Sequence, residues 1–325
     1  MHTDRTRPTR PHLGIALGLA LAGLLLAGCG GNDTAGGTGS SGAPSNSVPS
    51  SSAAATSTPI GVVAVENFWG DITRQIGGEH VTVTSILKDP NADPHSYETD
   101  PTDAAAISRA KFVVENGVGY DNFADKLLAA TRQPGRDVVA VSDVAHVSGD
   151  NPNPHLWYSP IYVKAAAQAI AEQLGKADPA DAADFQANLA TFLSGYQPYV
   201  DTLRQIKAKY AGAKVAYTER VPGYLIDAAG LVLGTPASFA QSIEDGNDPS
   251  PADTDAMDKA MTNKTVKVLF YNAQVTSPIT KKVQSLARSS GVPVVGVAET
   301  IPANEKDFQT WQTDQAKAVL AALGG

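Results

Sequence analysis

The chain has 325 residues, a hydrophobic fraction of 42%, a charged fraction of 18% and a formal net charge of −8 at pH 7. This length supports about two ordinary domains with their own cores, and the composition is that of a globular protein rather than a disordered one. The acidic balance argues against nucleic acid as a partner. A single cysteine, Cys29, excludes a disulfide within the chain.

Residues 1–28 predict a signal peptide. Three arginines near the start precede an apolar run over residues 13–27, which is too short for a comfortable membrane span. The run ends in "LAGC", and small residues before a cysteine at that place resemble the signal of a bacterial lipoprotein. The resemblance implies cleavage before Cys29 and lipid on that cysteine. The mature chain would then be anchored to the cell membrane on its extracytoplasmic face.

Residues 29–59 are predicted to hold the lipidated cysteine and a flexible linker. From residue 30 to residue 59 the chain is almost entirely Gly, Ser, Thr, Ala and Pro, and Asp33 is its one charged residue. A segment with so few apolar groups cannot build a core. About thirty such residues span roughly 30 Å as a coil, so the linker would let the folded part stand off the membrane.

Short valine-rich runs alternate with segments of helical spacing through the first part of the folded chain. This alternation predicts a mostly parallel sheet with helices on both faces, which we assign to an N-terminal lobe over residues 60–175. The predicted strands are 61–67, 81–87, 111–117 and 137–143, and the predicted helices are 68–78, 101–110 and 120–131.

A different pattern occupies residues 181–210, where apolar side chains recur in steps of 4, 3, 4, 3, 4, 3 and 4. These steps follow one face of a helix for about thirty residues, so we predict a long helix within a linking segment 176–211. Gly195 and Pro198 favour a kink, and two helices broken there are the alternative. The apolar positions are Phe185, Leu189, Phe192, Tyr196, Tyr199, Leu203, Ile206 and Tyr210.

The alternation of strands and helices returns after the long helix and predicts a C-terminal lobe over residues 212–325. The expected fold class is therefore α/β, with two lobes that each hold a mostly parallel sheet flanked by helices, joined by one long helix. The predicted strands of this lobe are 213–219, 266–272 and 292–298, and its predicted helices are 221–230, 251–263, 277–291 and 305–323.

Two histidines stand in similar loops that contain proline. His95 lies in "DPNADPHSYETDP" and His155 in "NPNPHLWYSP", each directly after a proline. Proline restricts its own φ and the conformation of the residue before it, so each histidine sits on a stiff loop beyond a predicted strand. Loops at the ends of parallel strands are where α/β folds bind ligands. On the residues alone, a metal ligand and an ordinary solvated histidine both remain open.

Other polar and aromatic residues have plainer interpretations. Trp69, Trp157 and Trp311 are assigned to the core or to packing between the lobes. Asp121, in "GYDNF", is expected to cap the helix that follows it. Glu66, directly after the first strand, lies near the expected binding site and is a candidate to support a metal ligand. The sequence contains no P-loop, serine nucleophile elbow or HExxH motif.

Several blocks, taken in their order, carry a resemblance to a known family. They read "DPHSYETDP", "AAAISRAKFVVENGVGYDNF", "NPHLWYSP", "YTERVPGYLIDAAGL" and "SIEDGNDPSPAD". This series resembles the zinc- and manganese-binding lipoproteins of bacterial ABC importers, the family 9 type of solute-binding protein, over about residues 60–322. The resemblance implies a divalent transition metal held in a cleft between two lobes. It also implies a monomer that delivers this metal to a membrane permease driven by an ATPase, and no enzymatic activity.

The resemblance also implies a ligand set for Zn2+ or Mn2+ as the transported ion. His95 and His155 match its two metal histidines, and Glu219 falls where the family has histidine or glutamate. The family's fourth ligand is an aspartate shortly after the strand that reads "VLFYN" here, but no carboxylate occurs between Phe270 and Ala298. Water is one candidate for that position. The other candidates for the fourth ligand or its support are Glu299, Asp245, Glu244, Thr276 and Glu66.

Two alternative functions remain open from the sequence. Because the expected aspartate is missing, the same architecture could bind a metal chelate or a small organic ligand. Two histidines, one glutamate and a water also form a catalytic zinc pattern, so a metal-dependent hydrolase is the third hypothesis. No motif supplies a separate general base for hydrolysis, which favours a binding protein.

Overall fold

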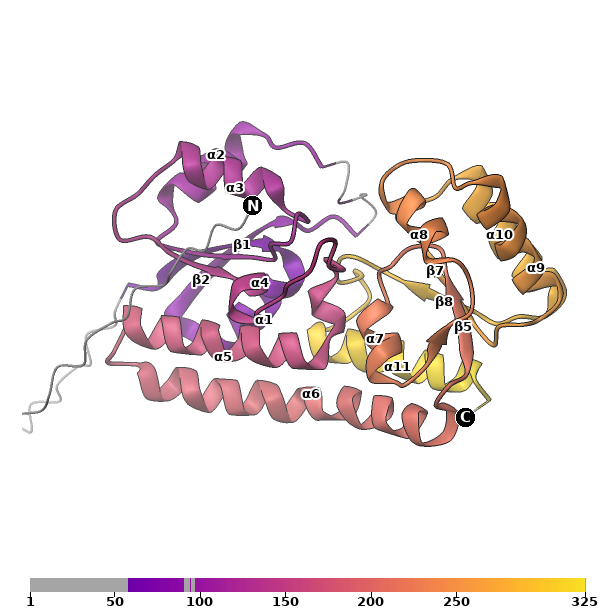
Figure 1. Ribbon diagram of the computed structural model, residues 1–325. Helices are drawn as coiled ribbons and strands as arrows, with labels where there is room; N and C mark the ends of the chain where they lie inside the picture. Colours follow the sequence, from indigo (N-terminus) through magenta and orange to yellow (C-terminus); the bar gives the residue numbers. More distant parts are fainter. Residues whose placement is uncertain (1–57, 91–93, 95–96, 325) are drawn as a thin grey trace, which may run out of the picture. The chain divides into compact units, whose positions relative to one another are not determined.

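The computed structural model describes residues 58–90, 94 and 97–324 of the protein (Figure 1). The predicted signal peptide, Cys29 and most of the predicted linker lie outside these residues, and so does His95. Residues Ala55–Gly325 form one compact unit. In the described ranges, no helix combines the length and the apolar character needed to cross a membrane.

The first sheet has four parallel strands in the order β2-β1-β3-β4. Its central strands are valine-rich and almost fully buried, as expected for a parallel sheet covered on both faces. The strands are β1 (Ile60–Glu66), β2 (Val81–Leu87), β3 (Phe112–Glu115) and β4 (Asp137–Ala140). The helical segments around them are α1 (Asn67–Gly77), η1 (Gly78–His80), α2 (Pro101–Arg109), α3 (Asn122–Ala130), α4 (Val141–Val144) and η3 (Leu156–Tyr158).

The second sheet repeats this topology, with parallel strands in the order β6-β5-β7-β8. Its strands are β5 (Lys214–Tyr217), β6 (Val232–Leu233), β7 (Leu269–Asn272) and β8 (Val294–Val297). The helices of this part are α7 (Gly223–Ala228), α8 (Ala237–Glu244), α9 (Pro251–Thr262), α10 (Pro278–Ser290) and α11 (Phe308–Ala322). In both sheets the strand order reverses beside the first strand, and such a switch point is where open α/β sheets bind ligands.

Helix α6 (Ala182–Tyr210) runs along both lobes, and α5 (Pro160–Ala177) lies beside it along the first sheet (Figure 1). Helix α6 continues through Gly195 and Pro198, so the alternative of two broken helices is wrong. Seven of its eight predicted apolar positions are buried, and Tyr210 is partly buried. Helix α6 packs against α1 and α5 on one side of the chain and against α7 and α11 on the other, which makes it the element that joins the two lobes.

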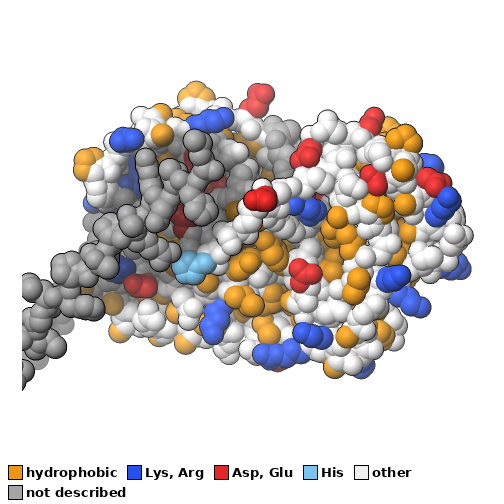
Figure 2. All heavy atoms as spheres, in the orientation of Figure 1, with side chains coloured by type: hydrophobic (Ala, Val, Ile, Leu, Met, Phe, Trp, Pro, Cys, Tyr) orange, Lys and Arg blue, Asp and Glu red, His pale blue; other side chains and the backbone are white. Residues whose placement is uncertain are grey.

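One hydrophobic core runs through the whole compact unit. It combines residues of both sheets with the apolar face of α6. Each sheet also has one smaller apolar cluster on its outer face. Trp69, Trp157 and Trp311 all belong to this shared core, as expected from the sequence. The fold class is confirmed: two α/β lobes, each with a parallel sheet flanked by helices, joined by one long helix. Charged side chains of both signs are scattered over the face drawn in Figure 2.

Candidate metal centre

Polar side chains gather at the carboxyl ends of the strands in both sheets. Glu66 ends β1 and Glu115 ends β3 in the first sheet, while Asn272 ends β7 in the second. Glu219 and Glu299 each lie two residues beyond the end of a strand, β5 and β8 respectively. All five side chains are buried, and Glu66, Asn272 and Glu299 have no exposed surface. Because buried carboxylates need protons, donors or a cation, this concentration marks the candidate site.

His155 enters this region from the first lobe with a defined ring orientation. Its Nδ1 lies 2.6 Å from the side-chain oxygen of Asn153, which also accepts the His155 backbone N–H at 3.1 Å. The amide oxygen can only accept, so Nδ1 carries a proton, and in the neutral imidazole the lone pair then lies on Nε2. Nε2 lies 3.3 Å from Oε2 of Glu299. The loop therefore presents Nε2 of the imidazole to a buried carboxylate.

Asn153 is itself held by the second lobe. Its side-chain amide donates to the backbone oxygen of Arg220 at 2.8 Å, and its backbone oxygen accepts from the hydroxyl of Tyr224 at 2.8 Å. The loop that carries His155 is also tied to the first sheet, because the Asn116 amide donates to the Pro154 oxygen at 2.8 Å. These contacts from both lobes fix the position of the imidazole.

The second lobe contributes two carboxylates that share one donor. The side-chain nitrogen of Asn272 donates to Oε2 of Glu219 at 2.5 Å and to Oε1 of Glu299 at 2.7 Å. The Asn272 oxygen accepts the backbone N–H of Gln274, and the Gln274 oxygen accepts the backbone N–H of Glu299. The two carboxylates are therefore held side by side by neutral amides. Among the described residues, neither forms an ion pair with Lys or Arg.

Tyr120 connects the first lobe to the same carboxylate. Its hydroxyl donates to Oε2 of Glu299 at 3.1 Å, and its ring packs edge-on against His155 and Trp157. Burial, together with the negative charges of Glu299 and Glu66, raises the pKa of Tyr120 well above its ordinary value. Tyr120 is therefore a permanent hydrogen-bond donor to Glu299.

A second group of acids lies nearby at the ends of β1 and β3. Burial, with Asp121 beside it, raises the pKa of Glu66 well above its ordinary value and favours its protonated form. Burial also raises the pKa of Glu115 to about 8, with Asp121 as the nearest negative charge. Neither carboxyl forms an ion pair with Lys or Arg among the described residues. Both carboxyls therefore favour the neutral, protonated form beside the candidate site.

Asp121 corrects one expectation from the sequence. It stands at the residue before α3, but its side chain does not cap that helix. Its carboxylate instead accepts the backbone N–H groups of Asn116 at 2.6 Å and Gly117 at 2.8 Å. Gly117 has a φ of +79°, so the turn after β3 places these two donors around the carboxylate. Asp121 therefore holds the loop after β3 rather than the helix.

The structure separates the candidates for the fourth position. Glu299 contacts His155 and Asn272, whereas Glu244 forms a bidentate ion pair with Arg220 at 2.7 and 2.9 Å. Asp245 and Thr276 are both exposed, and Glu66 belongs to the group around Asp121. Of the described residues in the predicted ligand set, His155 contacts Glu299, and Glu299 shares the Asn272 amide with Glu219. His95 lies outside the described residues.

Sequence reasoning missed Asn272, Tyr120 and Asn153. The signal for Asn272 is an amide at the end of an otherwise apolar strand, in "VLFYN", where the backbone leads directly into the site. Tyr120 follows the strained turn at Gly117 to Gly119, and Asn153 stands two residues before His155. Their roles depend on which strand ends meet in space, and a local pattern does not contain that information.

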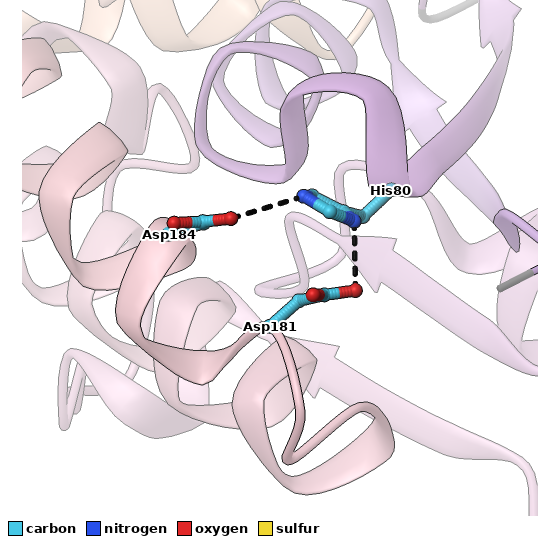
Figure 3. Close-up of side chains that lie close together, drawn as sticks. All are labelled: His80, Asp181 and Asp184. Atoms are coloured by element: carbon cyan, nitrogen blue, oxygen red, sulfur yellow. Dashed lines mark ion pairs between the residues drawn. The ribbon is translucent and has the colours of Figure 1, made fainter. Parts of the chain in front are cut away.

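A second cluster of histidine and carboxylates lies at the start of α6 (Figure 3). Nδ1 of His80 is 2.8 Å from Asp181, and Nε2 is 3.4 Å from Asp184. Each ring nitrogen therefore faces a different carboxylate, which is the geometry of an imidazole that bridges two acids. Carboxylates in the first turn of a helix also interact favourably with its dipole. We interpret this cluster as a contact that fixes η1 to the start of α6.

The protein thus has two α/β lobes, each built on a parallel sheet. Imidazole and carboxylate groups from both lobes lie in one buried polar site at the strand ends. The chain belongs to the family of zinc-uptake complex component A periplasmic proteins, which it matches over residues 62–322.

A related lipoprotein and two solved structures are similar to the chain. The chain is 23% identical over 257 residues to the manganese ABC transporter substrate-binding lipoprotein scaA of Streptococcus gordonii, covering 74% of this chain and 79% of scaA. The manganese-bound solute-binding protein FpvC of Pseudomonas aeruginosa matches with a TM-score of 0.68 at 22% identity, over 82% of this chain and 99% of FpvC. The periplasmic zinc-binding protein TroA of Treponema pallidum matches with a TM-score of 0.68 at 18% identity, over 82% of this chain and 99% of TroA.

Proposed function

We propose that this protein is an extracytoplasmic receptor that binds Zn2+ or Mn2+ and delivers it to an ABC importer. The observation that carries the proposal is the buried group of His155, Glu219 and Glu299, in which Nε2 of the imidazole faces a carboxylate at 3.3 Å. A site that gathers several buried acids beside an imidazole favours a cation. Imidazole nitrogen with carboxylate oxygen suits both Zn2+ and Mn2+.

The ligands in this proposal are His95, His155 and Glu219. His155 and Glu219 are fully buried side chains from the two lobes, so an ion between them would bind both lobes at once. The assignment of His95 rests on the sequence resemblance. Because imidazole must lose its ring proton to bind a metal, affinity should fall as the pH drops through the range in which histidine titrates.

The proposal extends to location and partners. The relatives named above include a lipoprotein of an ABC transporter, and the N-terminal sequence ending in Cys29 resembles a lipoprotein signal. We infer a lipid anchor at Cys29, a linker over 29–59, lobes over 60–175 and 212–325, and a linking segment over 176–211. The partners would be a permease with its ATPase, and the mature protein would act as a monomer.

Burial of the site favours an ion over the two alternative ligands. His155 and Glu299 have no exposed surface, and Glu219 has 1%. A metal chelate or an organic ligand would have to displace much of this packing, and a hydrolase would have to admit a substrate beside the metal. We therefore infer that the protein is not an enzyme. Turnover of an ester or peptide that disappears with chelator would contradict this inference.

Metal titration tests the proposal. The mature chain, purified in detergent and stripped with chelator, should bind one equivalent of Zn2+ or Mn2+, measured by competition with a fluorescent chelator and by elemental analysis. Glu219→Ala should weaken binding by on the order of 100-fold or more, because it removes a direct ligand. Asp245→Asn changes an exposed acid and is the matched control. A stripped parent protein that binds neither ion would sink the proposal.

A further inference from the structure

The start of α5 exposes an apolar side chain that the proposed function does not use. Among the described residues, three large apolar side chains are exposed, and Ile161, with 76% of its surface exposed, is the most exposed of them. It is the second residue of α5 and follows Pro160 at the helix start. A single exposed apolar residue is common on protein surfaces, so its surroundings decide whether it marks a contact.

Ile161 stands between two adjoining pockets on this face. One pocket lies between the start of α5, α6 and α7, the other lies between α5 and α6, and both include Pro160, Ile161 and Val200 in their walls. Tyr162 and Tyr224 line the first pocket, with their rings edge-on at 5.1 Å. These neighbours of Ile161 are only partly buried, so together the five residues form one apolar surface, the Ile161 patch.

Cations surround the Ile161 patch. Lys164, Arg204 and Lys207 line the two pockets and are exposed, and Asp227 is the one acid among the lining residues. Arg204 also pairs with Asp201 at 2.8 Å, but both side chains are more than half exposed, so this pair is weak. Figure 2 shows hydrophobic side chains gathered where α5 begins beside α7, with Lys and Arg side chains along α6. This face is therefore locally positive, although the whole chain has a net charge of −8.

An exposed aliphatic side chain with tyrosines beside it and cations around it matches the chemistry of an anionic membrane surface. Isoleucine can enter the boundary between headgroups and acyl chains, and tyrosine favours the same boundary. Each Lys or Arg is attracted to anionic headgroups. The acidic character of the rest of the chain does not prevent this contact, because charges more than about 8 Å from the membrane are largely screened at physiological salt.

We propose that the Ile161 patch is a membrane-contact surface that lies on anionic phospholipid. This inference goes beyond the proposed function, and it draws on the proposed lipid anchor at Cys29. The proposed linker of about thirty residues would keep the lobes within roughly 30 Å of the membrane, so even a weak contact would be occupied at that high local lipid concentration. The anchored protein would then have a preferred orientation, with the start of α5 towards the membrane.

Vesicle flotation of the mature chain with Cys29→Ser tests the patch without the lipid anchor. The probes are vesicles of phosphatidylcholine alone and vesicles of equal parts phosphatidylglycerol and phosphatidylcholine. We expect binding to the second kind only, and its loss at about 1 M salt, where the screening length falls to about 3 Å. Ile161→Ser should weaken this binding by about 10-fold, because it removes the apolar side chain that enters the membrane. Lys207→Gln should weaken it by about fivefold.

Matched variants control for these substitutions. Val138→Ser changes an exposed apolar residue outside the patch, and Lys281→Gln changes an exposed basic residue outside it. Both should bind the anionic vesicles like the parent. Binding to neither kind of vesicle, equal binding to both kinds, or an Ile161→Ser variant that binds like the parent would overturn the proposal.

A fluorophore on Gln197→Cys in the Cys29→Ser chain reports the orientation, because the chain then has no other cysteine. Gln197 lines the second pocket and is exposed. Lipids that carry a quencher should reduce its emission on anionic vesicles, and a fluorophore on Ser285→Cys, exposed on α10, should be little affected. Self-association that Ile161→Ser abolishes, without vesicle binding, would assign the patch to a second copy of the chain and overturn the proposal. Metal titration of the parent is independent of these results, so the proposed function is tested separately.

Discussion

Within the described residues, two clusters each place a histidine beside carboxylates, and they differ in how the imidazole is used. At the candidate centre, Nδ1 of His155 is committed to an amide oxygen, so Nε2 alone faces the carboxylates. At the start of α6, both nitrogens of His80 face carboxylates, and 65% of the Asp184 side chain is exposed. The same residue types thus build the candidate metal centre in one place and, in our interpretation, a structural contact in the other. The two imidazoles differ in the partner of Nδ1, which is a neutral amide oxygen for His155 and a carboxylate for His80.

Burial sharpens this comparison. The side chains of His155 and Glu299 are fully buried, whereas the His80 and Asp181 side chains keep 17% and 25% of their surface exposed. Water can solvate the acids around His80, so that cluster needs no cation. The acids around His155 are buried away from water, so their electrostatic attraction to a bound cation is much stronger there.

The largest expected effect is on metal affinity, and it distinguishes His155 from His80. His155→Ala should weaken Zn2+ and Mn2+ binding by on the order of 100-fold or more, because it removes a ligand and its fixed orientation. His80→Ala is the matched variant and should leave both dissociation constants unchanged. Isothermal titration of both variants beside the parent checks this. Equal losses in the two variants would mean that the comparison above is wrong.

An intermediate effect concerns the acids beside the centre. Glu115 has a pKa of about 8 in the folded protein, above its ordinary value in the unfolded chain. Between the ordinary pKa of 4.5 and the folded pKa of about 8, the unfolded chain has lost this proton while the folded protein keeps it, so the free energy of unfolding should fall as the pH rises. Glu115→Gln has no proton to lose and should be about 1–2 kcal/mol more stable than the parent at pH 8.

Urea unfolding of chelator-treated protein at pH 4 and pH 8 measures this difference. Near pH 4 the two proteins should have similar midpoints, because Glu115 is protonated in the folded state and largely so in the unfolded chain. A Glu115→Gln variant that is less stable than the parent at pH 8 would show that the carboxyl is ionised and stabilised by a partner.

The smallest expected effect falls on the contact at the start of α6. His80→Ala should lower the free energy of unfolding by about 1 kcal/mol, because it removes two partly exposed ion contacts and an edge-on contact with Phe185. Part of this loss should disappear at 1 M salt, where exposed charges are screened. Thermal unfolding at low and high salt tests it. A loss of bound metal in this variant would instead make the cluster a metal site.

Much of the fold was predictable because its patterns are local. The spacing of Phe185 to Ile206 predicted one long helix face, and these residues form part of the shared core. The valine-rich runs predicted the parallel strands. The strand predicted over 137–143 ends at Ala140, however, because Val141–Val144 form a short helix. Buried apolar residues occur in both strands and short helices, so the apolar run did not show where the strand ends and the helix begins.

The site was predictable only in part. Loops with proline made His155 a candidate and the family resemblance added Glu219, and both stay predictions as metal ligands. The choice of Glu299 over Glu244 and Asp245 was not accessible, because it depends on the register of β7 with β8 and on the ion pair of Glu244 with Arg220. Asp121 was misread for a similar reason. Its position suggested a helix cap, but the turn after β3 brings two backbone N–H groups to its carboxylate.

The central claim is that one transition-metal ion binds at His155, Glu219 and Glu299. A crystal structure of metal-loaded protein, with anomalous diffraction measured on both sides of the metal absorption edge, tests it most directly. We expect one strong anomalous peak at about 2.0–2.2 Å from Nε2 of His155 and from oxygens of Glu219 and Glu299. A peak at His80, Asp181 and Asp184 in place of this one would contradict the claim.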